Sequence, residues 1–104
     1  MEYKVYTTNE FDKEIEKLSG EEKRRIEIIF LQLKENPYVG NQLQIRPLRE
    51  KRFEEKRIYY LIFDDLKSIL MIAISDKRNQ QKMIDFIREN INNYRDILKE
   101  ILDN

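Results

Sequence analysis

The sequence predicts one α+β domain, residues 1–104, with a small, mainly antiparallel sheet, an N-terminal helical hairpin and a C-terminal helix. A length of 104 residues is typical of a single domain. Two apolar runs joined by a short polar turn indicate a β-hairpin, and apolar residues spaced three and four apart on either side of it indicate helices. The chain has only two Gly and two Pro, so regular elements with short connections are expected.

The N-terminal segment is predicted to form a strand that leads into a helix. Residues 3–8 (YKVYTT) are β-branched and aromatic with alternating polarity, as in a short strand. Thr8 or Asn9 can cap the helix that follows. That helix is indicated by apolar residues at spacings of four and three, namely Phe11, Ile15 and Leu18.

A second helix follows closely and completes the hairpin. Ser19 with Glu22 forms a capping-box pattern at its start, and Asn36-Pro37 ends it because the residue before proline disfavours helical backbone. Its apolar stripe is predicted to contain Ile26, Ile29, Phe30 and Leu33, widened by Ile28 and Leu31.

Three strands are predicted next. Residues 42–54 alternate in polarity but are interrupted near Pro47, which favours an edge strand. Residues 56–63 (KRIYYLIF) are the strongest strand of the chain, and residues 64–67 form a turn. Residues 68–75 (SILMIAIS) are apolar at every interior position, so we expect a central strand that is buried on both faces.

A long amphipathic helix is predicted over about residues 79–102. Its heptad-like seam contains Ile84, Ile87, Ile91, Tyr94, Leu98 and Ile101. The predicted element order is therefore β-α-α-β-β-β-α, with the helices on one face of the sheet and the other face left for function. The seam either packs on its own domain, as such stripes more often do, or contacts a partner.

Composition limits the chemistry. There is no His, no Cys and no net charge, so we expect no disulfide, no metal and no cofactor, and any catalysis must use Lys, Arg and carboxylates. The paired carboxylates lie where helices begin or chains turn, which is typical of caps and solvated turns. Neither a signal-peptide pattern nor a membrane span is recognisable, so a cytoplasmic protein without membrane contact is expected.

Positive charge is concentrated in two segments. Residues 43–57 contain six basic and three acidic side chains, and residues 75–82 contain three basic and one acidic. If the strands are consecutive neighbours, four basic residues converge on one side of the sheet, where they suit a phosphodiester: Arg49, Lys51, Arg57 and Arg78. The alternative is that these are solvated strand ends in surface ion pairs with Glu50, Glu54 and Glu55.

Tyr59 and Tyr60 are adjacent in the strongest strand and must point to opposite faces. We expect one in the core and one outside, where it can stack on a base of single-stranded RNA. A cross-strand aromatic pair is the more common alternative.

The order of these segments resembles that of the RelE/ParE superfamily of toxins. The similarity rests on YKVYTT, on KENP at 34–37, on LREKRFEEKRIYYLIFDD at 48–65 and on ISDKRNQQ at 74–81. The resemblance implies a toxin of a type II toxin–antitoxin system, neutralised by a cognate antitoxin. RelE-like members cut mRNA in the ribosome by attack of the 2′-hydroxyl on the adjacent phosphorus, and basic residues assist.

Carried over by position, the resemblance implies catalytic roles for Lys51, Arg57 and Arg78. The RNA-binding residues it implies, together with the charge pattern, are Arg49, Arg52, Tyr60, Lys77, Lys82 and Phe86. Phe86 falls where RelE-type enzymes commonly have a tyrosine, and the chain is neutral where they are usually basic. Two alternatives therefore stand beside the ribonuclease: a ParE-like toxin that binds DNA gyrase without catalysis, and a member that only binds its antitoxin.

Overall fold

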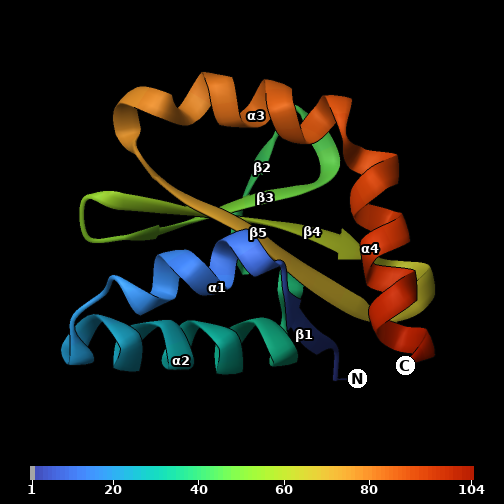
Figure 1. The fold of residues 1–104 in the computed structure, drawn as a ribbon, viewed down its shortest axis with the longest axis horizontal. Helices are drawn as coiled ribbons and strands as arrows, with labels where there is room; N and C mark the ends of the chain where they lie inside the picture. The colour runs from blue at the N-terminus through green and yellow to red at the C-terminus, as the bar shows by residue number, and fades with distance from the viewer. Residues whose placement is uncertain (1) are drawn as a thin grey trace.

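The computed structural model describes residues 2–104 and contains one five-stranded mixed sheet (Figure 1). The strand order is β1-β5-β4-β3-β2. Only β1 runs parallel to its neighbour β5, and all other pairs are antiparallel. The strands are β1 (Lys4–Thr7), β2 (Asn41–Leu43), β3 (Ile45–Phe53), β4 (Lys56–Phe63) and β5 (Ser68–Asp76). The mainly antiparallel sheet is confirmed, and β5 is an internal strand between β1 and β4, as predicted.

Helices cover both faces of the sheet. In Figure 1, α1 and α2 lie below the strands, whereas α3 lies above them and α4 beside them. The helices are α1 (Asn9–Glu16), α2 (Gly20–Glu35), α3 (Gln80–Glu89) and α4 (Ile91–Asp103). The expectation that all helices share one face is wrong, because the C-terminal seam needs an apolar surface of its own and takes the second face. None of the helices formed by residues 2–104 is long and apolar enough to cross a membrane.

Alternation along β4 divides the core into two layers. Tyr60 and Ile62 pack with α1 and α2, whereas Tyr59 and Leu61 pack with α3 and α4. Because both faces are buried, nearly every residue of β4 is buried. This double burial explains why β4 and β5 are near-continuous apolar runs in the sequence.

The helix boundaries of the N-terminal hairpin follow the predicted signals. The Thr8 hydroxyl accepts a hydrogen bond from the Phe11 N–H at 3.1 Å. Ser19 and Glu22 form the reciprocal capping box, and Asn36 ends α2. Two stripe residues differ from expectation: Ile28 is 56% exposed and Leu31 is 61% exposed.

The predicted single helix over 79–102 is wrong, because the chain bends at Asn90 and separates α3 from α4. The Asn90 side-chain amide donates to the Phe86 carbonyl at 2.8 Å, and its backbone has left the helical region. An Asn side chain that bonds the preceding turn competes with continued helix. The bend lets α3 and α4 cover different parts of one sheet face.

The interruption in the strand predicted over residues 42–54 lies at Gln44, whose φ is 58°, and not at Pro47. Gln44 separates β2 from β3. Pro47 is tolerated inside β3 because the pairing with β4 begins only at Leu48. The expected edge strand is therefore an internal strand along the part of β3 that pairs with β2, up to Glu50.

Candidate functional site

Arg57 of β4 and Glu50 of β3 form a buried ion pair under α3. Arg52 lies directly opposite Arg57, and Glu50 opposite Tyr59, so all of these side chains share one face. The Arg57 Nε lies 3.1 Å from the Glu50 Oε1, and the two side chains are only 9% and 4% exposed. The Arg57 Nε–H nevertheless meets no acceptor in hydrogen-bonding geometry within residues 2–104. A guanidinium with an unsatisfied donor can still bind an anion there.

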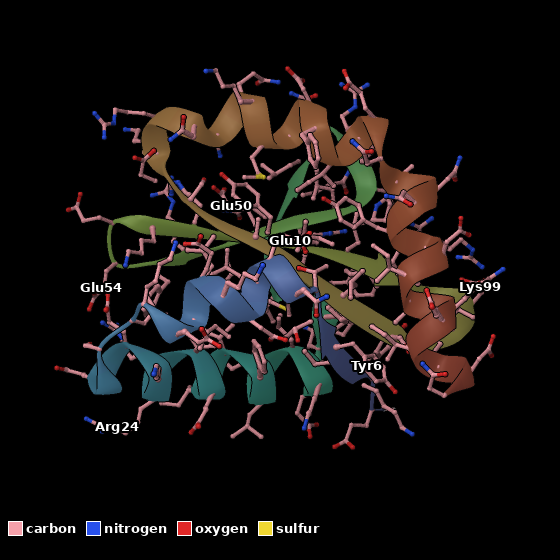
Figure 2. The ribbon with its side chains drawn as sticks, viewed as in Figure 1. Tyr6, Glu10, Arg24, Glu50, Glu54 and Lys99 are labelled. Carbon is pink, nitrogen blue, oxygen red and sulfur yellow. The ribbon has the colours of Figure 1, made fainter. Side chains whose placement is uncertain are left out.

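Gln80, the first residue of α3, covers this pair. Its side-chain amide donates to the Glu50 Oε1 at 2.8 Å. In Figure 2, Glu50 lies between α3 and the strands. This hydrogen bond ties the start of α3 to Glu50.

Tyr59 and Ser75 extend the polar group along the same face. Ser75 of β5 pairs in register with Arg57, and the Tyr59 hydroxyl lies 2.9 Å from the Ser75 Oγ. Burial raises the pKa of Tyr59, so it stays protonated at neutral pH. We call Glu50, Arg57, Tyr59, Ser75 and Gln80 the Arg57 cluster.

The predicted convergence of Arg49, Lys51, Arg57 and Arg78 is wrong. Lys51 pairs with Ile58, which packs in the α1–α2 core, so Lys51 lies on the face opposite Arg57. Arg78 follows β5 as predicted, but its side chain is 90% exposed and it pairs with Asp76 at 3.2 Å. The acidic residue Glu50 lies next to Arg57 instead.

Arg49 also faces away from Arg57. Its guanidinium lies 5.0 Å from the centre of the Tyr38 ring, and it donates at 3.4 Å to the Gly40 carbonyl and to the Gln42 side chain. These contacts fix the loop before β2. These contacts of the Arg49 side chain are therefore structural ones within the domain.

Tyr60 is buried, so the prediction that one of the two tyrosines faces outward to stack on RNA is wrong. Both Tyr59 and Tyr60 are 0% exposed. The Tyr60 hydroxyl donates to the Pro37 carbonyl at 2.7 Å and accepts from the Gly40 N–H at 3.1 Å. Burial raises the pKa of Tyr60 to about 12.

The other predicted RNA-binding residues are exposed near the Arg57 cluster or on α3. Arg52 and Lys77 are exposed, and Lys82 and Phe86 line a groove of about 560 Å³ between α1, α3 and α4. Its apolar floor includes Ile72 and Ala73 of β5, whereas Arg57 does not line it. Phe86 is 54% exposed and is available for stacking.

Glu50 was anticipated only as a solvated ion-pair partner of the basic strand residues, whereas the structure buries it beside Arg57, and Gln80 was not predicted. A two-residue loop at Glu54-Glu55 would have set Arg52 opposite Arg57 and so revealed Glu50 on the same face. Gln80 carried no signal, because a polar residue at the start of a helix is ordinary. Among residues 2–104, no group of acidic side chains is arranged to hold a metal ion.

Comparison with known proteins identifies the fold. No protein-family model matches the sequence, and no curated protein matches it significantly. Solved structures do match. A mutant E. coli toxin RelE in the free state matches 86% of this chain and 98% of its own, with a TM-score of 0.72 and 13% identity.

Two antitoxin complexes match in the same way. A chain of the archaeal RelE–RelB complex from Pyrococcus horikoshii matches 74% of this chain and 97% of its own, with a TM-score of 0.69 and 19% identity. A chain of the intact E. coli RelBE complex matches 71% of this chain and 95% of its own, with a TM-score of 0.65 and 14% identity. The protein is thus an α+β domain with helices on both sheet faces. More narrowly, its fold is that of the RelE toxins, as the segment order suggested.

Proposed function

We propose that this chain is the toxin of a type II toxin–antitoxin system and is neutralised by a cognate antitoxin protein. The observation that carries the proposal is the RelE fold, which matches nearly the full length of solved RelE chains. Several of those chains are bound to the antitoxin RelB. The buried charged cluster on one sheet face adds to it, because folds alone host many functions and a site is needed.

The activity we propose is cleavage of mRNA on the ribosome, with Arg57 and Glu50 as catalytic residues. The Glu50 carboxylate takes the proton from the 2′-hydroxyl, whose oxygen then bonds to the adjacent phosphorus. The Arg57 guanidinium binds the phosphate oxygens as their charge increases. The bond to the 5′ oxygen breaks, water protonates that oxygen, and a cyclic phosphate remains. Lys51 has no role in this scheme because it faces the other side of the sheet.

RNA can reach Arg57 only if Gln80 releases Glu50. One hydrogen bond of 2.8 Å holds that contact, and the residues just before it are exposed. The exposed cations around this end of the sheet would bind the RNA backbone on its way to Arg57. They are Arg52, Lys77, Arg78 and Lys82.

Induced expression in a bacterial host tests the toxin assignment. We expect wild-type protein to arrest growth, co-expression of the antitoxin to restore it, and Arg57→Lys to lose most toxicity because a single ammonium cannot replace the guanidinium fork. Lys51→Ala should remain toxic. Normal growth with abundant, folded wild-type protein would contradict the proposal.

A non-catalytic toxin is the second candidate. Phe86 favours this candidate, because its side chain has no proton to transfer. Glu50 favours it too, because its carboxylate neutralises the charge of Arg57 in the buried ion pair. Such a protein would act by contact, either on DNA gyrase as ParE-like toxins do or on its antitoxin alone. If gyrase supercoils DNA normally in the presence of the purified protein, gyrase is excluded as its target.

A further inference from the structure

One stretch of β3 has a partner strand on only one side. β2 pairs with β3 only as far as Asn41 opposite Glu50, whereas β4 continues to pair with β3 up to Phe53. Residues 51–53 therefore form a short free edge, with no second strand beside them anywhere in residues 2–104. The unpaired N–H and C=O groups of such an edge are a template for an added strand.

A groove runs along this edge against α2. It has a volume of about 300 Å³ and is lined by Ile28, Ile29 and Phe53 together with Lys51, Arg52 and Arg25. Ile28 is 56% exposed, and the next turn of α2 adds Leu31 at 61%. An apolar strip of this kind on a helix surface, beside a free strand edge, is typical of a docking surface.

The charge of the groove indicates what docks there. Arg25 is already paired with Glu54 at 2.9 Å and lies over the Phe53 ring. By contrast, no acidic side chain of residues 2–104 lies within ion-pairing distance of Lys51 or Arg52. Because Lys51 and Arg52 point to opposite faces of β3, an added strand would meet one cation on each face.

We propose that this free edge and groove bind an extended, acidic segment of the antitoxin, which adds as a strand beside residues 51–53. This inference rests on the proposed toxin function, which supplies the partner. Backbone hydrogen bonds would provide affinity, and alternate side chains would provide specificity. The segment carries acidic side chains toward Lys51 and Arg52, and an apolar side chain between Ile28 and Phe53.

The exposed apolar strip favours protein over RNA as the occupant. An RNA strand would use the two cations but would leave Ile28 and Leu31 uncovered, whereas an amphipathic segment covers both kinds of surface. RNA binding is therefore a competing outcome that the experiment must separate.

Calorimetric titration of the full chain with its antitoxin tests the surface. The double variant Lys51→Glu/Arg52→Glu should bind at least about tenfold more weakly, and increasingly so at low salt. Ile28→Ser should weaken binding severalfold. The matched controls Lys13→Glu/Lys99→Glu and Leu102→Ser change exposed residues elsewhere and should bind as wild type does. Amide exchange should show new protection at residues 51–53 in the complex.

The outcomes are distinct. Undiminished binding by the charge-reversed variant, or protection at β1 without protection at residues 51–53, overturns this surface while leaving the toxin function intact. Unchanged antitoxin binding together with loss of RNA binding also overturns it, because Lys51 and Arg52 would then serve RNA alone. Folded wild-type protein that binds no antitoxin contradicts the proposed function and the surface together.

Discussion

Glu50 and Arg57 are diagonal neighbours on one face of the β3–β4 pair, with the Arg57 Nε 3.1 Å from the Glu50 Oε1 and both side chains almost completely buried. A buried charge is tolerated only when it is paired, so each residue determines the cost of changing the other. The pair is at once the proposed catalytic site and a structural element. Its mutants must therefore be tested for both properties.

Removal of Arg57 alone should destabilise the fold. Arg57→Ala leaves the Glu50 carboxylate buried without its cation, and we expect a loss of about 3–5 kcal/mol in the free energy of unfolding. The double variant Glu50→Leu/Arg57→Met should recover much of that loss, because an apolar pair can replace a buried ion pair. Urea denaturation measures both. Equal destabilisation in the two variants would show that the pairing is not the cause.

Tyr60 should govern stability through its hydroxyl. Tyr60→Phe leaves the Pro37 carbonyl and the Gly40 N–H without their buried partner, which costs about 1–3 kcal/mol. Because burial raises the pKa of Tyr60 to about 12, the unfolded chain loses this proton first as the pH rises. The contribution of Tyr60 is therefore complete below about pH 10 and is lost between pH 10 and 12. Urea denaturation at several pH values in this range should show that the free energy of unfolding falls less steeply with pH in Tyr60→Phe than in wild type.

Gly40 should tolerate no side chain. A Cβ there would lie 2.5 Å from the Tyr60 hydroxyl oxygen and 2.7 Å from the Glu50 carbonyl oxygen. Gly40→Ala should therefore lower the free energy of unfolding by about 1–3 kcal/mol, as overpacking usually does. Gly20→Ala is the matched control, because its nearest neighbour would be the flexible end of Arg24 at 3.9 Å. Equal midpoints in thermal unfolding for the two variants would refute the close contact.

Asp64 should make the protein sensitive to acid. Its carboxylate accepts hydrogen bonds from Tyr38 and, at 2.7 Å, from Tyr3, and these bonds hold its pKa below the ordinary value of 3.8. The unfolded chain therefore takes up this proton first as the pH falls, and the stabilisation present above about pH 4 is lost below it. Asp64→Asn should lower stability at neutral pH, with a difference from wild type that shrinks in acid. Asp103→Asn, at the exposed C-terminal end, should show no such effect.

Helix caps and apolar runs predicted most helix and strand positions well, because these signals depend only on residues close in sequence. The capping pairs at Thr8 and at Ser19 with Glu22 marked the helix starts, and the apolar runs marked β4 and β5. The bend at Asn90 was missed because the apolar seam continues through it at helical spacing. The second covered face was missed because periodicity shows which residues are buried, but not against which side of a sheet.

Which side chain lies beside Arg57 depends on the register between β3 and β4, and the sequence does not specify that register. The β3–β4 turn has no Asn-Gly signal, and instead Glu54 adopts a positive φ of 55°. A shift of one residue exchanges Lys51 for Glu50 beside Arg57. Arg57 was singled out by its place at the start of an apolar strand and by the resemblance to RelE-like toxins, and its catalytic role stays a prediction. Glu50 was only one of three glutamates considered as ion-pair partners, because the register was unknown.

Ribosome-programmed mRNA cleavage, mapped by primer extension, tests the central proposal most directly. Wild-type protein should cut within the codon in the ribosomal A site. Glu50→Gln keeps the size of the side chain but removes the base, and Arg57→Lys removes the guanidinium, so both should lose the cuts while Lys51→Ala keeps them. Cuts that persist in Glu50→Gln and Arg57→Lys, or no cuts from well-folded wild-type protein, would contradict the proposed catalytic pair.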